Sequence, residues 1–360
     1  FVPDMLSGNF SAEVRLGYIV KDGKKTYSEG IEDIGIPENN GIDPIIQTAP
    51  PIYKGQTKAL TNFNGLSGGG PPDPSGAAGP KNYVQAKNTS YKIYHKDGTS
   101  NGGASSLASL WTGSTSDGDP IVMYDRYAER WFISQFQTDS DEILIAISET
   151  SDPTGSYFAY SFSVPVGGAG FPDYPKFGVW PNGYYMSANC NGNNCVVFER
   201  EKMLLGDPNA GIIRMNFPSS VRYFFRSFAP AYAEGATEPD ADEPFYYFHI
   251  QDNSWSGIST DHIKVIKCEV DWSSPSSSSV TVAQEIETEA FNSVFTNSWD
   301  DITQKGSSQK LDAVGGIFMY KAQYRRFEGS PRYNQQTGAG LKMDDQRGWG
   351  YRPFRGDPSS

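Results

Sequence analysis

The sequence has few of the residues on which metal enzymes and nucleic-acid-binding proteins depend. It contains three histidines and three cysteines in 360 residues, and the histidines form no His-Glu-x-x-His motif or close pair. This argues against a zinc enzyme, because zinc sites need closely spaced nitrogen, sulfur or carboxylate ligands. The formal charge is −12 and no basic stripe is present. A nucleic-acid partner is therefore not expected, because phosphate binding needs clustered Lys and Arg.

Other common motifs are also missing. No apolar run approaches the roughly 18–20 residues of a membrane span, and no signal peptide is visible. Phe1 to Asp4 resembles the interior of a mature chain, so we expect any leader to lie outside this sequence. There is no Gly-x-Ser-x-Gly motif, no P-loop, no dinucleotide-binding glycine motif ahead of a helix, and no sialidase-type Asp box. These absences leave few enzyme classes that could be recognised by motif.

Aromatic residues and turn formers are abundant, whereas helix-forming runs are scarce. Phe, Trp and Tyr make up 14% of the chain, which also has 38 Gly and 24 Pro. Aromatic and β-branched residues favour strands, and Gly and Pro favour the turns between them. The composition therefore predicts an all-β protein.

The stretch from Asp117 to Phe136 shows the unit from which the chain is built. A short apolar strand is predicted at Pro120–Tyr124, and an alternating strand at Arg130–Phe136. The five residues between them, Asp125–Glu129, have the right length for a hairpin loop. Similar units recur, each with an aspartate and Pro or small residues ahead of a strand. The repeated aspartates are Asp73, Asp119, Asp173, Asp242 and Asp312.

The spacing of these aspartates predicts the architecture. It grows from 46 to 70 residues along the chain, and a period of roughly 40–50 residues with four strands is typical of a propeller blade. We therefore predict a β-propeller of six or seven four-stranded blades. Residues 1–70 would form an extended lead-in that packs on or closes the propeller, 71–328 the blades, and 329–360 an irregular tail that closes the ring.

Four motifs occur in order along the chain. They are PPDPSGAAGPKNYVQAKN, GDPIVMYDRYAERWFISQF, SDPTGSY and DYPKFGVWPNGYYMSAN. Together they resemble a family of large secreted or surface-attached bacterial proteins whose shared module is a β-propeller. The resemblance covers about Gly65 to Phe327 and implies a propeller fold and a secreted or cell-surface location. It brings no set of catalytic residues with it.

The repeated aspartates allow three interpretations. If each opens the innermost strand of its blade, the five carboxylates would meet at one mouth of the channel and could bind Ca²⁺. Asp119 and Asp173 could instead serve as the paired carboxylates of a glycosidase. In the third interpretation each aspartate only accepts hydrogen bonds within a turn. A lyase pair of His249 or His262 with a tyrosine is a further alternative without diagnostic spacing.

Aromatic side chains on loops are candidates for contact with a sugar ligand. Trp255 and Trp299 lie in polar loops, and Tyr184 lies in an aromatic pair; exposed rings of this kind stack on sugar faces. The alternative is that Trp131, Trp180 and the Tyr184–Tyr185 pair belong to the core.

The cysteines predict one small disulfide. Cys190 and Cys195 bracket four polar residues, so they could be joined at the tip of a hairpin, which would imply an oxidising compartment. The alternative is two free thiols. Cys268 alternates like a core residue and is expected to be buried and inert.

These observations lead to an extracellular or cell-surface recognition or adhesion module as the main prediction. It would bind a glycan or a protein partner, with Ca²⁺ as the one expected cofactor, and would not be an enzyme. The first alternative is a polysaccharide-active enzyme, a glycoside hydrolase or lyase, with its site at the channel mouth. The second is a structural subunit of a larger extracellular assembly.

Overall fold

The computed structural model of the chain describes most of the residues between 61 and 293 and several shorter segments. The described residues are 18–21, 24–27, 61–68, 70–164, 172–190, 192, 194–223, 225–293, 300–312, 315–319, 322–327, 330–334, 339–344 and 348–353. For residues 18–21, 24–27, 300, 301, 312, 326, 327, 330–334, 339–344 and 348–353 only the backbone is described. The predicted lead-in, residues 1–70, therefore lies largely outside the described residues.

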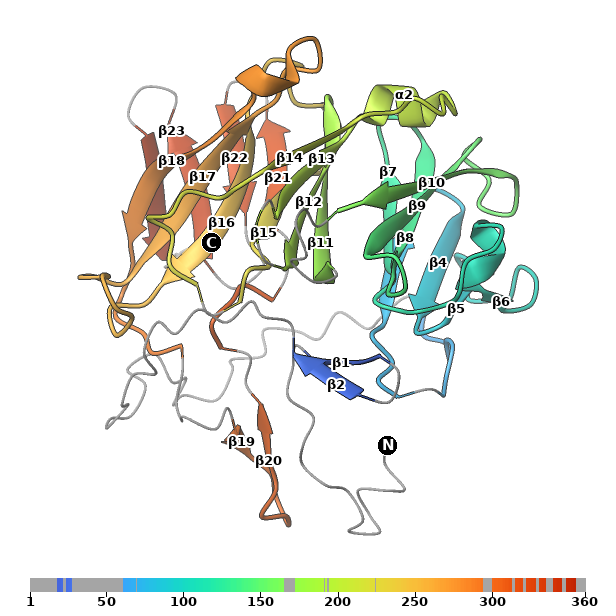
Figure 1. Cartoon of the computed structure of the whole chain (residues 1–360), viewed down its shortest axis with the longest axis horizontal. Coiled ribbons are helices and arrows are strands. Elements are labelled where there is room, and N and C mark those ends of the chain that lie inside the picture. Colours follow the sequence, from blue (N-terminus) through green and yellow to red (C-terminus); the bar gives the residue numbers. More distant parts are fainter. Residues whose placement is uncertain are drawn as a thin grey trace, which may run out of the picture. The chain divides into compact units, whose positions relative to one another are not determined.

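The chain divides into two compact units. The first holds two sheets, in each of which four strands follow one another antiparallel in chain order; we call such a group a meander (Figure 1). Its elements are β3 (Ser75–Ala78), β4 (Asn82–Lys87), β5 (Ser90–His95), β6 (Ser105–Ser106), the 3₁₀ helix η1 (Leu107–Leu110), β7 (Ile121–Asp125), β8 (Arg130–Gln137), β9 (Glu142–Ser148) and β10 (Tyr157–Ser163).

The second unit holds three further meanders. Its main elements are β11 (Asp173–Trp180), β12 (Gly183–Asn189), β13 (Cys195–Phe198), β14 (Ile212–Met215), β15 (Ala229–Ala233), β16 (Phe245–Gln251), β17 (His262–Glu269), the 3₁₀ helix η2 (Pro275–Ser277), β18 (Ser279–Glu287), β21 (Ala322–Phe327), β22 (Ser330–Asn334), β23 (Ala339–Asp344) and β24 (Gly348–Pro353). Two small hairpins accompany them, β1 (Tyr18–Lys21) with β2 (Lys24–Tyr27), and β19 (Asp300–Thr303) with β20 (Lys310–Asp312). The short helix α2 (Arg200–Leu204) spans the boundary between the units.

The fold is thus all-β, as the composition predicts. The described part of the chain contains five four-stranded meanders, whereas the repeat predicted six or seven. The last two meanders form a single eight-stranded sheet, because β15 pairs in parallel with β21 as well as antiparallel with β16. Residues 330–353 form three strands of this sheet, although the sequence suggested an irregular tail.

The stretch around Asp125 folds as expected. β7 and β8 form a hairpin in which Asp125 pairs with Arg130. The buried Asp125 carboxylate accepts hydrogen bonds from the amides of Tyr127 and Ala128, at 3.2 and 3.1 Å, and so closes the loop.

Within each unit the first strands of successive meanders lie side by side. In the first unit β3 lies beside β7, and the Ser75 hydroxyl accepts a 2.9 Å hydrogen bond from the Val122 amide. In the second unit β11 lies beside β15, which lies beside β21. The backbones approach closely here: a Cβ on Gly178 would meet the carbonyl oxygen of Ala231. Glycine at this position therefore allows the two first strands to come together.

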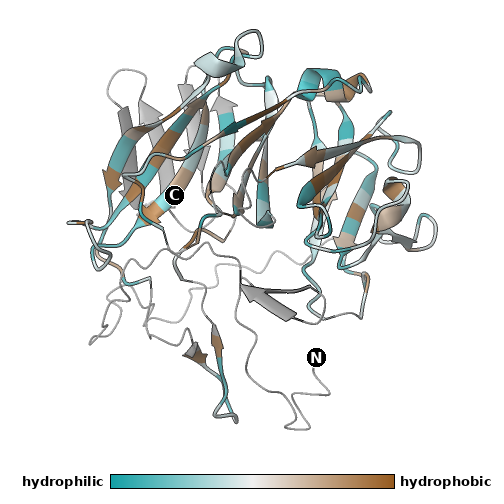
Figure 2. Cartoon of the chain, viewed as in Figure 1, coloured by the Kyte–Doolittle hydropathy of each residue, from teal (hydrophilic) through white to brown (hydrophobic). Residues whose placement is uncertain are grey.

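Aromatic residues form the core of each unit. In the first, the Trp131 ring lies between the two meanders, and its indole N–H donates to the carbonyl of Ser151 at 3.0 Å. In the second, Tyr185 stacks on Phe245 with ring centroids 3.8 Å apart, and Trp180 packs edge-on against Phe245. Along several strands hydrophobic and hydrophilic bands alternate (Figure 2), as expected for strands with one face in a core.

In the part of the chain that the structure describes, no helix is both long enough and apolar enough to cross a membrane.

Candidate functional site

One asparagine contacts two of the predicted aspartates in the first unit, the carboxylate of Asp73 and the backbone of Asp119. The Asn88 amide N–H donates to Asp73 Oδ2 at 2.5 Å, and Asn88 Oδ1 accepts the backbone N–H of Asp119 at 2.8 Å. Asn88 itself lies at the turn between β4 and β5, and its amide also donates to the Pro71 carbonyl at 3.3 Å. Its side chain therefore connects the residues that precede β3 and β7. We call Asp73, Asn88 and Asp119 the carboxylate cluster.

The backbone of both aspartates is unusual. Asp73 has a φ of 34° and Asp119 a φ of 45°, in the left-handed region that few residues other than glycine adopt. Each is followed by proline and lies two residues ahead of its strand. Residues held in sparsely populated backbone regions occur preferentially at functional sites, because surrounding structure must maintain them. Both side chains are half-buried.

The second unit repeats this backbone feature with a different residue. Tyr174, which precedes Pro175 at the start of β11, has a φ of 50°. The residue equivalent to Asp73 and Asp119 is therefore Tyr174, and Asp173 lies one position earlier, before a bulge in β11. Asp173, which the sequence repeat placed in this role, is the first residue of β11, as predicted, but it does not have the left-handed backbone of Asp73 and Asp119. Asp119 and Asp173 also lie in different units, and their proposed pairing stays a prediction.

The remaining repeated aspartates do not open first strands. Asp242 is exposed in the loop before β16, which is the second strand of its meander. Asp312 ends β20, a strand of the small β19–β20 hairpin. The prediction that Asp242 and Asp312 each open the first strand of a blade is therefore wrong. An aspartate before a strand also occurs at ordinary turns, so the pattern alone does not identify a first strand.

No group of three His, Cys, Asp or Glu side chains that could hold a metal ion occurs among the residues that the structure describes. The carboxylate cluster has two carboxylates and one amide, fewer ligands than the six to eight oxygens that Ca²⁺ takes. Calcium binding at Asp73, Asp119, Asp173, Asp242 and Asp312 stays a prediction.

The predicted ligand-contacting aromatics are buried. Tyr184 has an exposed fraction of 0% on β12, and Trp255 one of 1%, so neither ring is available to stack on a sugar. Trp255 turns inward because the loop folds back: Asp252 Oδ1 accepts the Ser254 amide at 2.7 Å, and the indole packs toward His249. The core assignment of Trp131, Trp180, Tyr184 and Tyr185 is confirmed by their burial. Trp299 lies outside the described residues.

The predicted disulfide is also absent. Cys190 and Cys195 are both buried free thiols, and Cys195 instead has its sulfur 3.9 Å from that of Cys268. Burial raises the pKa of Cys190 to about 12. The predicted hairpin is present, because β12 and β13 pair antiparallel, but Cys195 begins β13 and its side chain is buried in the core.

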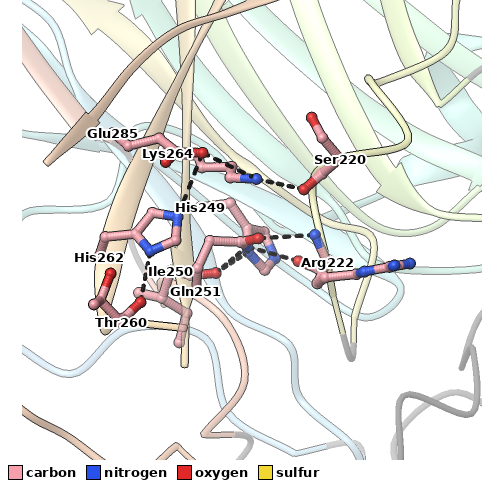
Figure 3. Close-up of polar contacts among 9 residues, drawn as sticks. All are labelled: Ser220, Arg222, His249, Ile250, Gln251, Thr260, His262, Lys264 and Glu285. Carbon is pink, nitrogen blue, oxygen red and sulfur yellow. Dashed lines mark hydrogen bonds and ion pairs between the residues drawn. The ribbon is translucent and has the colours of Figure 1, made fainter. Parts of the chain in front are cut away.

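A second group of polar residues lies on one face of the sheet in the second unit (Figure 3). His249 pairs with Lys264 across β16 and β17, Gln251 pairs with His262, and Lys264 pairs with Glu285 on β18. Residues that pair across antiparallel strands lie on the same face, so these five side chains form one polar surface. We call it the polar face. All of them except Glu285 are buried.

The polar face holds the segment that leads from β14 to β15. Gln251 binds the backbone of Arg222 in both directions, accepting its N–H at 2.8 Å and donating to its carbonyl at 2.7 Å. The Lys264 ammonium donates to the Ser220 carbonyl and lies 3.3 Å from Glu285 Oε1 (Figure 3). These polar side chains thus supply hydrogen-bond partners for the backbone of the connecting segment.

His249 is the most deeply enclosed residue of the polar face. Its two ring nitrogens face carbonyl oxygens, Nδ1 that of Ile250 at 2.6 Å and Nε2 that of Phe225 at 3.3 Å. Burial lowers the pKa of His249 to about 4, although both carbonyls favour the protonated form. His262 Nδ1 donates to the Thr260 carbonyl oxygen, 2.7 Å away. Both histidines are therefore bound to backbone groups of the fold.

Lys176 is a candidate that the sequence analysis missed. It follows Pro175 on β11, its ammonium donates to the Phe318 carbonyl, and it lies 5.3 Å from the centre of the Tyr174 ring. Burial lowers the pKa of Lys176 to about 7. Its position in the repeat could have identified it in the sequence. Lys176 directly follows Pro175, just as Ser75 and Ile121 directly follow the prolines of the first two meanders.

No known protein family matches the chain, and no curated protein matches it in sequence. Among solved structures, the catalytic domain of the GH62 α-L-arabinofuranosidase of Coprinopsis cinerea is 12% identical, with a TM-score of 0.33 over 78% of this chain and 88% of that one. The α-L-arabinofuranosidase of Lactobacillus brevis is 11% identical, with a TM-score of 0.31 over 80% and 91%. A GH62 hydrolase in complex with xylotriose is 11% identical, with a TM-score of 0.32 over 78% and 89%.

These comparisons contradict the main functional prediction. The sequence led us to a non-catalytic recognition or adhesion module, whereas the solved structures found are hydrolases by their descriptions. The recognition module is therefore set aside. The first alternative from the sequence, a polysaccharide-active enzyme, is taken up below.

Proposed function

We propose that the chain is a polysaccharide-active enzyme of the glycoside hydrolase type, with the carboxylate cluster as its reaction centre. The observation that carries the proposal is the Asn88 side chain, which connects Asp73 and Asp119 at the beginnings of β3 and β7. The fold thereby brings together two acidic residues that lie 46 positions apart in the sequence.

Two carboxyl groups at one place are the chemical requirement of glycoside cleavage. One protonates the leaving oxygen, and the other attacks the sugar or activates water. The Asn88 amide orients the Asp73 carboxylate by donating to Oδ2, so we assign Asp73 as nucleophile or base. Asp119 is then the acid, positioned through its backbone N–H.

We further propose that the five meanders are the blades of a β-propeller. In such a fold the first strands surround a central axis, which puts each first strand next to the following one. The side-by-side pairs β3 with β7, β11 with β15 and β15 with β21 support this arrangement. The carboxylate cluster, at the start of two first strands, would then lie at one mouth of the channel.

The substrate class follows from the reaction type. A glycan polymer would be the partner, and the resemblance of the four sequence motifs to secreted or surface-attached proteins supports a location outside the cell. In that location extracellular or cell-wall polysaccharides would be available to the enzyme.

The test is an activity screen on purified protein against a panel of neutral and acidic polysaccharides, measured as new reducing ends. Asp73→Asn and Asp119→Asn should each lower the rate at least about a hundredfold, by removing a proton-transfer group. Asp242→Asn is the matched control, because Asp242 is an exposed aspartate that belongs to the second unit.

Thermal melting of all three variants separates chemistry from folding. The proposal requires that the two cluster variants melt close to the wild-type temperature while losing activity. It fails if the wild-type protein releases no products from any polysaccharide, or if Asp73→Asn and Asp119→Asn remain as active as Asp242→Asn.

A further inference from the structure

The structure places two cysteines from different meanders in contact. Cys195 begins β13 and Cys268 lies near the end of β17, 73 positions apart in sequence and with 3.9 Å between their sulfur atoms. Both side chains have an exposed fraction of 0%. A disulfide bond is about 2.0 Å long, so the two sulfur atoms, 3.9 Å apart, would have to approach each other by about 1.9 Å to bond.

We propose that Cys195 and Cys268 form a disulfide that links the β11–β14 meander to the β15–β18 meander. This inference does not depend on the proposed catalytic activity. It replaces the Cys190–Cys195 pairing that sequence spacing alone suggested.

The surroundings explain why the bond would form during folding. The two thiols lie beside the buried phenols of Tyr185 and Tyr247, and burial raises the pKa of Cys268 well above its usual value. Thiolates are the reactive species in disulfide exchange, so the folded, reduced pair would react slowly. Before the two meanders pack, the same thiols are accessible to an oxidant.

Oxidised glutathione is a sufficient oxidant. One protein thiolate attacks a glutathione sulfur and releases one reduced glutathione, and the second protein thiolate then attacks the mixed disulfide and releases another. Two protein S–H bonds and one glutathione S–S bond break, while one protein S–S bond and two glutathione S–H bonds form. The two electrons leave the protein with the glutathione.

Peptide mapping tests the pairing directly. Denatured, reduced protein is refolded with oxidised and reduced glutathione, its free thiols are alkylated, and it is digested with trypsin without reduction. Cys190 and Cys195 share the tryptic peptide 177–200, whereas Cys268 lies in 268–305. The proposed bond therefore gives a cross-linked peptide pair, and a Cys190–Cys195 bond gives a single looped peptide.

The variants distinguish which cysteine of peptide 177–200 takes part. Cys190→Ala should retain the cross-link, and Cys268→Ala and Cys195→Ala should lose it. The cross-linked wild type should melt roughly 5 °C or more above its reduced form, because the bond closes a long loop. A looped peptide, complete alkylation of all three cysteines, or a cross-link that needs Cys190 would overturn the proposal. Since mapping of the wild type is decisive, misfolding of an alanine variant does not prevent the test.

Discussion

The carboxylate cluster and the polar face both gather polar side chains, but they differ in what those side chains contact. On the polar face, Gln251 and His249 are completely buried and bind backbone groups of a neighbouring segment. In the cluster, Asp73 and Asp119 are half-buried and sit on a left-handed backbone. Burial with backbone partners indicates a structural role, because an unpaired group there would be costly. Partial exposure with backbone strain is typical of a reactive site.

Because of this difference, substitutions in the two regions should affect different properties of the protein. Changes on the polar face should lower the free energy of unfolding, and changes in the cluster should lower the rate of the proposed reaction.

Asn88→Ala should reduce polysaccharide cleavage by about 10²–10³-fold, because it removes the donor that orients a reacting carboxylate. The measurement is the initial rate on the best substrate from the screen, with Asn101→Ala, in the turn after β5, as control. Equal rates for the two variants would place Asn88 among the structural groups and erase the contrast with the polar face.

Gln251→Leu should lower the free energy of unfolding by about 3 kcal/mol. The substitution leaves the partly buried N–H and C=O of Arg222 without their side-chain partner, and each such group costs roughly 1–3 kcal/mol. Urea unfolding at neutral pH measures the change. A loss below about 1 kcal/mol would mean that water or another group replaces Gln251.

His249 should make the protein less stable in acid. Its pKa is about 4 in the folded protein and about 6.5 in an unfolded chain, so the unfolded state binds the proton more readily. Stability is then fully present above about pH 6.5 and declines as the pH falls to 4, by on the order of 3 kcal/mol.

The matched variants for this pH effect are His249→Gln and His95→Gln. His95 is exposed, so its replacement should leave the acid-dependent loss unchanged, whereas His249→Gln should reduce it. Unfolding in urea at several pH values between 4 and 7 gives both curves. Identical curves for the two variants would assign the acid sensitivity to other groups.

Glu285→Gln should have the smallest effect, about 0.5 kcal/mol. Its carboxylate is 3.3 Å from the Lys264 ammonium, but the side chain is 55% exposed and solvent screens the interaction. A loss above 2 kcal/mol in urea unfolding would show that Lys264 depends on this charge in addition to the Ser220 carbonyl.

The sequence predicted the strands well and the site only in part. The period-2 pattern and the turn residues locate β7, β8 and the hairpin at Asp125, because these signals are local. The strands β22–β24 were missed, since the C-terminal segment is polar and Gly-rich and pairs through contacts that are remote in sequence. The number of blades stays a prediction.

The candidate site, too, depends on contacts between residues that are remote in the sequence. Asp73 and Asp119 were found because each precedes a proline and a strand, but Asn88 carries no local signal that it contacts both. Trp255 was predicted to be exposed because its neighbours are polar, yet Asp252 turns the loop inward. Whether a side chain is buried or joins a site depends on its contacts with residues that are distant in the sequence. A single sequence does not reveal those contacts.

The strand β15 also has a consequence for how the protein is made. It pairs with β16 through Ala229 and Pro230, and with β21 through the three residues that follow. β21 leaves the ribosome some 90 residues after β15, so the second edge of β15 stays unpaired while the chain is being synthesised. An unpaired edge can recruit strands of other chains. Translation that stops before β21 should therefore yield aggregation-prone fragments, and the C-terminal meander would protect the protein from association with its own copies.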